Sequence, residues 1–100
     1  MIREVTDNQF EESIKEGRVL VDFYSTNCPP CKQLAPVLEI LSEDINSVTF
    51  LKINVDKEML HASKLSIASV PTLILFSGGK EIKRKTGLLP KTVLKSWISS

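Results

Sequence analysis

The sequence predicts an α/β fold with a mixed central sheet of about five strands and helices on both faces. Segments of strand and of helical periodicity alternate in the order β-α-β-α-β-α-β-β-α. Residues 19–24 form a nearly continuous apolar run, typical of a central strand covered on both faces. A Gly-Gly turn within 77–80 predicts that the last two strands form a hairpin.

The length and composition favour a single domain over residues 1–100. Two separate cores in 100 residues would each bury too little surface. Hydrophobic residues make up 42% of the chain, and no stretch approaches the roughly 18 apolar residues that a membrane span needs. The first residues lack the pattern of an export signal, so we expect a cytoplasmic protein. We also expect it to be a monomer.

Charge is balanced overall but divided unevenly along the chain. The net charge of +1 gives no general attraction to nucleic acid or to anionic lipid. Residues 1–50 carry 9 acidic and 4 basic side chains, whereas residues 51–100 carry 3 and 9. This division suggests an oriented docking surface, unless folding mixes the two halves.

The first half predicts a short strand near 2–5, a helix over 7–16 and the central strand 19–24. Thr6 and Gln9 have the spacing of a capping box, and Gly17 suits a left-handed helix end. Asp22 is the single carboxylate within the central strand.

A long amphipathic helix is expected directly after Cys31. Apolar residues recur there at helical spacing, at Leu34, Leu38, Leu41 and Ile45. Pro36 lies inside this pattern, where it removes a backbone hydrogen bond and predicts a kink.

The second half predicts a strand over 48–55, a short helix over about 57–64 capped by Asp56, and a strand over 73–76. His61 lies on that short polar helix and is expected to be exposed and without function.

The returning strand 81–86 is rich in charge, which protects a sheet edge from pairing with other chains. Pro90 fits the first turn of a last helix, and Trp97 lies on its apolar face, where we expect it to be part of the core. The side chains interpreted as edge protection, with partner docking as a lesser alternative, are Lys80, Lys83, Arg84 and Lys85.

Cys28 and Cys31 are the only cysteines, and their spacing favours redox chemistry. A bridge between residues three apart closes a very short loop and constrains the unfolded chain little. A helix that begins at Cys28 places its sulfur near unpaired N–H groups and the positive end of the helix dipole, which stabilise a thiolate. We therefore expect Cys28 to be the nucleophile and Cys31, one turn inside, to be shielded and to resolve the mixed disulfide.

Half of a zinc site is the alternative interpretation of this cysteine pair. Zinc requires about four ligands, and the chain offers no second cysteine pair and only one histidine, His61. Ligand count therefore disfavours a metal site.

Several motifs together resemble the thioredoxin family along nearly the whole chain. They are Val21-Asp22-Phe23-Tyr24, Cys28-Pro29-Pro30-Cys31-Lys32, Pro36, Val70-Pro71-Thr72-Leu73 and Gly87. The resemblance implies a thioredoxin fold and reduction of protein disulfides by dithiol exchange, with no bound cofactor. It further implies electrons from NADPH through a thioredoxin reductase, and peroxiredoxins, methionine sulfoxide reductases and ribonucleotide reductase as candidate substrates.

By the same resemblance, Asp22 is the buried carboxylate that accepts the proton of the second cysteine. Lys52, on the adjacent expected strand, matches the family lysine that modulates it. A lone Asp in a buried strand should have a raised pKa unless it is paired. The alternative is an Asp that faces solvent at a strand end.

The resemblance also implies a substrate-binding group. Pro71 matches a cis-proline opposite the dithiol, Val70 would offer its backbone to the substrate, and Gly87 would let a substrate backbone approach. Without the resemblance, a trans-proline before a strand and a turn glycine would be the ordinary interpretations.

The chain departs from the usual family motif Trp-Cys-Gly-Pro-Cys at two positions. Asn27 replaces an aromatic ring beside the nucleophile, which bears on substrate range. Pro29 removes a backbone donor near Cys28 and, with Pro30, stiffens the loop, so we expect a less stabilised thiolate.

Two rival functions remain open at this point. One is a specialised oxidant, isomerase or partner-specific redox protein. The other is a binding subunit with the same fold and no catalysis by its cysteines.

Overall fold

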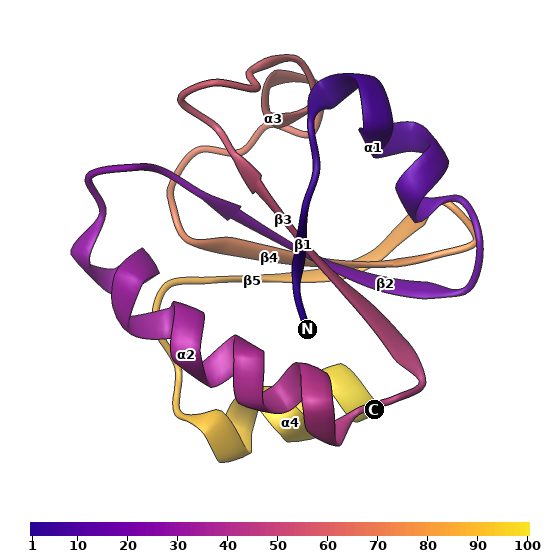
Figure 1. Ribbon diagram of the computed structural model, residues 1–100, viewed down its shortest axis with the longest axis vertical. Coiled ribbons are helices and arrows are strands. Elements are labelled where there is room, and N and C mark those ends of the chain that lie inside the picture. Colours follow the sequence, from indigo (N-terminus) through magenta and orange to yellow (C-terminus); the bar gives the residue numbers. More distant parts are fainter.

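The computed structural model describes residues 1–100 and contains five strands and four helices (Figure 1). The elements in chain order are β1 (Arg3–Glu4), α1 (Asp7–Ile14), β2 (Arg18–Tyr24), α2 (Pro29–Asp44), β3 (Val48–Asn54), α3 (Leu60–Lys64), β4 (Thr72–Ser77), β5 (Lys80–Thr86) and α4 (Lys91–Ser99). This order confirms the predicted α/β fold.

The five strands form one mixed sheet in the order β1-β3-β2-β4-β5. β3 runs parallel to both β1 and β2, whereas β4 runs antiparallel to β2 and β5. β2 is therefore central, and the five residues 19–23 are buried, as expected for a strand covered on both faces.

Helices cover both faces of the sheet (Figure 1). One core cluster joins Leu20 and Phe50 of the sheet to apolar side chains of α2 and α4. The other joins Val21 and Ile53 to Phe10 and Ile14 of α1. Alternate residues of one strand thus serve the two cores.

The long helix predicted after the cysteines is confirmed as α2. Its Leu34, Leu38 and Leu41 are buried, Ile45 lies at its C-terminal cap, and Pro36 lies inside the helix. On the entry to α1, the Thr6 N–H donates to Gln9 Oε1 at 3.0 Å, the backbone-to-glutamine half of the expected capping box.

The prediction for α3 was wrong at its start and at its cap. The helix begins at Leu60, and Asp56 accepts the Thr26 N–H at 2.9 Å instead of capping it. The Leu60 and His61 N–H groups donate to the Asp7 carboxylate, at 3.0 and 3.2 Å. A carboxylate from α1 has therefore taken the capping position.

The prediction that His61 is exposed was also wrong. His61 is only 6% exposed, and its ring stacks on Phe10 with 4.4 Å between centroids. Its Nδ1 lies 2.9 Å from Asp7 Oδ1. The residue faces α1 because Asp7 binds the start of its helix.

Trp97 and the charges of β5 have more specific contacts than expected. Trp97 is half-buried against the core, and Lys83 Nζ lies 5.2 Å from its ring centroid. Lys83 also donates to the Trp97 carbonyl at 2.6 Å, while Arg84 pairs with Glu81 at 2.6 Å. Lys80 and Lys85 are exposed on the edge strand, as predicted.

No helix of the structure is long and apolar enough to span a membrane.

Candidate active site

The two cysteines lie at the start of α2, just beyond the end of the central strand β2. Cys28 is the N-cap residue with extended backbone angles, φ −138° and ψ 95°. Pro29 and Pro30 occupy the first helical positions, where a fixed φ suits a helix start. The predicted place of Cys28 at the helix entrance is therefore correct.

A disulfide bond joins Cys28 and Cys31, with 5.2 Å between their Cα atoms. The Cys31 N–H donates to Cys28 Sγ at 3.2 Å. Because Pro29 and Pro30 have no N–H, this is the only backbone donor among the first three residues of α2. The sulfur of Cys28 thus has one direct donor in addition to the helix dipole.

The expected contrast in exposure between the cysteines is absent in this disulfide form. Cys28 is 5% exposed and Cys31 is 4% exposed, because the bridge holds the two sulfurs together. The two residues differ in another respect: Cys31 lines an adjacent cavity, and Cys28 does not.

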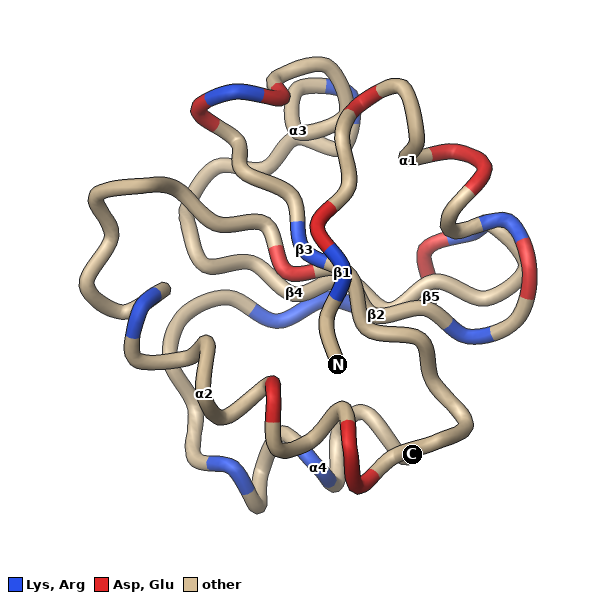
Figure 2. The backbone as a smooth tube through the Cα atoms, viewed as in Figure 1, with Lys and Arg blue, Asp and Glu red and all other residues tan.

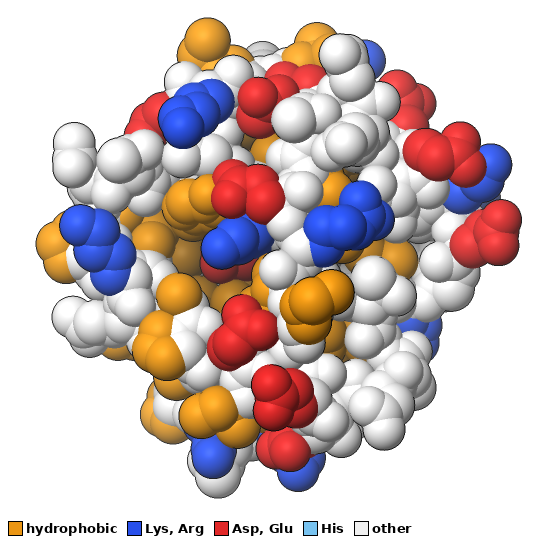
Figure 3. All heavy atoms as spheres, in the orientation of Figure 1, with side chains coloured by type: hydrophobic (Ala, Val, Ile, Leu, Met, Phe, Trp, Pro, Cys, Tyr) orange, Lys and Arg blue, Asp and Glu red, His pale blue; other side chains and the backbone are white.

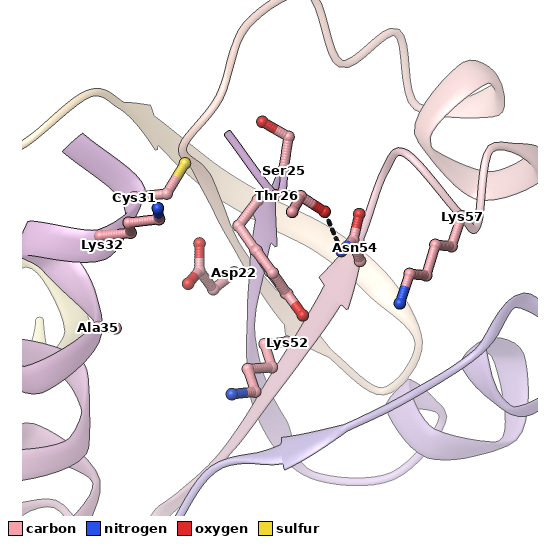
Figure 4. A pocket seen from close by; sticks show the side chains of 10 residues that line it. Asp22, Ser25, Thr26, Cys31, Lys32, Ala35, Lys52, Asn54 and Lys57 are labelled. Carbon is pink, nitrogen blue, oxygen red and sulfur yellow. Dashed lines mark hydrogen bonds between the residues drawn. The ribbon is translucent and has the colours of Figure 1, made fainter. Parts of the chain in front are cut away.

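That cavity has a volume of about 330 Å³ and lies between α2 and the ends of β2 and β3 (Figure 4). The side chains of Cys31, Asp22 and Lys52 all face it. Its other lining residues are Tyr24, Ser25, Thr26, Lys32, Ala35, Asn54 and Lys57.

Asp22 is a buried carboxyl group on the central strand. It is 5% exposed, which excludes the alternative of a solvent-facing Asp, and its Oδ1 has no hydrogen-bond partner. Burial raises the pKa of Asp22 to about 7, while the positive charge of Lys52 opposes the rise. Lys52 is its direct neighbour across the β2–β3 pair.

The loop before Cys28 is fixed by contacts that the sequence did not indicate. Asn54 Nδ2 donates to Thr26 Oγ1 at 3.1 Å, and the Thr26 N–H donates to Asp56 at 2.9 Å. The Asp56 N–H in turn donates to Asn54 Oδ1 at 2.9 Å. The next residue, Asn27, is exposed beside Cys28.

The Val70–Pro71 peptide bond is cis, which excludes the ordinary trans interpretation. The Gly87 N–H donates to the Pro71 carbonyl at 2.9 Å, so the two segments are tied together. Gly87 has φ +84°, a conformation that favours glycine, and a Cβ there would meet no atom within 4 Å. The space beside Gly87 is therefore open.

The thioredoxin family model matches residues 1–100, the whole of the chain. The chain belongs to the thioredoxin family. A thioredoxin of Chlamydia trachomatis is 44% identical over 99 residues, which cover 99% of this chain and 97% of that protein. A thioredoxin of Rickettsia bellii is 41% identical over 103 residues, with 100% and 98% covered.

A solved structure agrees with this assignment. A mutant thioredoxin from Halobacterium salinarum superposes with a TM-score of 0.90 at 33% identity, covering 98% of this chain and 88% of that one. The chain therefore has the thioredoxin fold and the dithiol–disulfide oxidoreductase function of its family. Membership also implies interaction with a thioredoxin reductase and with disulfide substrates in general.

Proposed function

We propose that the protein reduces protein disulfides and that Cys28, Cys31 and Asp22 carry out the reaction. The Cys28 thiolate attacks one sulfur of a substrate disulfide, forms a mixed disulfide and releases the first substrate thiolate. Asp22 accepts the proton of Cys31. The Cys31 thiolate then attacks Cys28 Sγ, which releases the second substrate thiolate and leaves the Cys28–Cys31 disulfide.

The observation that carries this proposal is the common cavity of Cys31 and Asp22. The unpartnered carboxyl oxygen of Asp22 has no competing hydrogen bond, and its pKa of about 7 suits a proton acceptor that works near neutral pH. Cys28, at the start of α2, has the helix dipole and the Cys31 N–H to stabilise its anion. Lys52 modulates the ionisation of Asp22.

A substrate segment would bind beside the dithiol at the cis-proline. In this proposal the backbone of Val70 pairs with the extended substrate, Pro71 positions it, and Gly87 leaves room for its backbone. The open space at the Gly87 Cβ position supports this arrangement. Asn27 would contact the substrate in place of the family tryptophan.

The partners follow from the chemistry of the family. We propose that a thioredoxin reductase transfers electrons from NADPH to the Cys28–Cys31 disulfide in the cytoplasm. Peroxiredoxins, methionine sulfoxide reductases and ribonucleotide reductase are the candidate clients. The protein would act as a single domain and a monomer.

Insulin reduction with dithiothreitol tests the reductase activity. The protein should accelerate insulin precipitation, and both Cys28→Ser and Cys31→Ser should lose turnover. Only Cys31→Ser should accumulate mixed disulfides with clients, because its Cys28 still attacks and nothing resolves the product. No acceleration over Cys28→Ser would refute the reductase proposal.

The two rivals give different results in related measurements. Equilibration with glutathione buffers yields the reduction potential, and a strongly oxidising value would assign an oxidant or isomerase role. A binding subunit would form no mixed disulfides in the Cys31→Ser variant.

A further inference from the structure

Three charged side chains form a row across the sheet beside the dithiol. Glu4 of β1 pairs in register with Lys52 of β3, and Lys52 pairs in register with Asp22 of β2. Residues in register on neighbouring strands present their side chains to the same face. Lys52 therefore lies between two carboxyl groups, on the sheet face that α2 covers.

Tyr24 holds the outer carboxylate of this row in place. Its hydroxyl donates to Glu4 Oε2, and Lys52 Nζ lies 5.9 Å from the Tyr24 ring centroid. Burial raises the pKa of Tyr24, and the hydrogen bond and charge of Glu4 raise it further. The phenol therefore remains a proton donor to Glu4 at neutral pH.

The Lys52 ammonium lies between the two carboxyl groups and forms a close ion pair with neither. None of the six ion pairs of the structure, all within 4.0 Å, includes it. Figure 3 shows acidic and basic side chains next to one another at the centre of the face where β1, β3 and β2 meet in Figure 1. The position of a flexible ammonium between two anions depends on the attraction of both, because each attraction weakens with distance.

We propose that Glu4, held by Tyr24, is a positioning residue for dithiol exchange. Glu4 draws the Lys52 ammonium away from Asp22, and Asp22 therefore stays basic enough to accept the Cys31 proton. This inference rests on the proton-accepting role of Asp22 in the proposed function. Without Glu4, the full charge of Lys52 would favour the ionised form of Asp22 and weaken it as a base.

The size of the effect follows from the spacing of the strands. Neighbouring strands lie about 4.8 Å apart, so the charges of Glu4 and Asp22 are about 10 Å apart across Lys52. At that separation, the direct repulsion of one unit charge alone shifts an ionisation midpoint by about half a pH unit in a partly solvated site, and the action through Lys52 adds to it. The direct neighbours of Asp22 in the sheet are Lys52 on β3 and the apolar Leu73 on β4. The other titratable or charged groups that line its cavity are Tyr24, Cys31, Lys32 and Lys57, and Glu4 follows Lys52 in the row.

Titration of the Asp22 carboxyl carbon by NMR, in the full oxidised chain, tests the proposal directly. Glu4→Gln should lower the midpoint by more than the roughly half pH unit that direct repulsion alone gives. Glu4→Asp keeps the charge and should restore most of the original midpoint. Glu16→Gln is the matched control: Glu16 is exposed, makes no hydrogen bond or ion pair, and precedes the opposite end of β2, so the midpoint should not move.

A Lys52→Gln background separates positioning from direct repulsion. If Glu4 acts through Lys52, Glu4→Gln should move the midpoint there only by the roughly half pH unit of direct repulsion, which is less than in the natural chain. An equal shift in both backgrounds, or no shift in the natural chain, overturns the proposal. Because the oxidised protein titrates without turnover, this result is independent of insulin reduction, in which Glu4→Gln should move the acid limb of kcat/KM to lower pH.

Discussion

Asp22 is a carboxyl group whose ionisation opposes folding. Its folded-state pKa of about 7 lies above the value of 3.8 for an unperturbed Asp, because burial disfavours the charged form. The folded state therefore holds the proton more tightly than the unfolded state does. The associated stability is fully present below about pH 4 and is lost as the pH rises through about 7.

Asp22→Asn should accordingly stabilise the oxidised protein at neutral pH. An amide of the same shape carries no charge to desolvate, so the free energy of unfolding should rise by about 4 kcal/mol at pH 8, with little change at pH 4. Urea denaturation at the two pH values measures the difference. If the free energy of unfolding rose equally at pH 4 and pH 8, the gain would not come from removing the charge of Asp22. Asp44→Asn, on an exposed position of α2, should show no such gain.

Pro29 leaves the sulfur of Cys28 with a single donor from the first three residues of α2. Pro29→Gly restores one N–H near that sulfur and should lower the pKa of the Cys28 thiol. The thiolate absorbance of the reduced Cys31→Ser background, followed against pH with and without Pro29→Gly, reports this pKa. An unchanged or higher value in the glycine variant would count against the role of the donor.

At the scale of elements, α1 and the segment 58–61, which leads into α3, cap one another. Glu58 Oε1 accepts the Asp7 N–H at 2.8 Å, and the Asp7 carboxylate accepts the Leu60 and His61 N–H groups of α3. The His61 ring adds a contact of 2.9 Å to the same carboxylate. Each helix start thus receives an acceptor from the other segment.

Asp7→Ala should destabilise the protein by about 1 to 2 kcal/mol at pH 7, the usual effect of losing a helix cap. Burial alone would raise the pKa of Asp7, but hydrogen bonds from the His61 ring and the two N–H groups outweigh it and lower the pKa below 3.8. A lowered folded pKa gives stability that is present above pH 3.8 and lost as the pH falls through the folded value.

The free energies of unfolding of Asp7→Ala and of the natural chain should therefore become equal at acid pH. Asp44→Ala, which removes only a long ion pair of 3.9 Å to Lys95, is the control and should change stability little. A loss for Asp7→Ala that stays constant down to about pH 2 would show that the carboxylate charge is unimportant.

The sequence predicted the elements whose patterns are local. The apolar run of β2, the leucine spacing of α2 and the Gly-Gly hairpin each depend on neighbouring residues, and all three are confirmed. The start of α3 depended on Asp7, which lies 53 positions from Leu60. His61 was misplaced for the same reason, since its burial depends on a partner in another element.

In the active site too, features that depend on neighbouring residues could be predicted, and contacts between distant residues could not. Cys28 at a helix start could be predicted from the neighbouring helical pattern, and Lys52 near Asp22 followed from the resemblance to the family. The Tyr24–Glu4 bond could not, because it depends on the register of β1 against β3 and joins residues 20 apart. The network of Thr26, Asn54 and Asp56 likewise joins two loops that only the folded chain brings together.

Over the whole molecule, folding mixes the acidic and basic halves of the chain. The sheet order β1-β3-β2-β4-β5 interleaves strands of both halves, so Lys52 lies between Glu4 and Asp22. Figure 2 shows acidic and basic residues on both sides of the fold. The acidic and basic halves of the sequence therefore do not form two separate charged surfaces. Opposite charges instead lie next to one another, as in the row Glu4, Lys52 and Asp22 beside the dithiol.

We propose that Cys28 reacts before Cys31, as an anion at the start of α2. Alkylation of the fully reduced protein with iodoacetamide at pH 7, with the modified residue located by peptide mass spectrometry, tests it most directly. We predict that Cys28 is modified well before Cys31 and faster than free cysteine. Modification of Cys31 first, or a Cys28 rate no greater than that of free cysteine, would contradict the account.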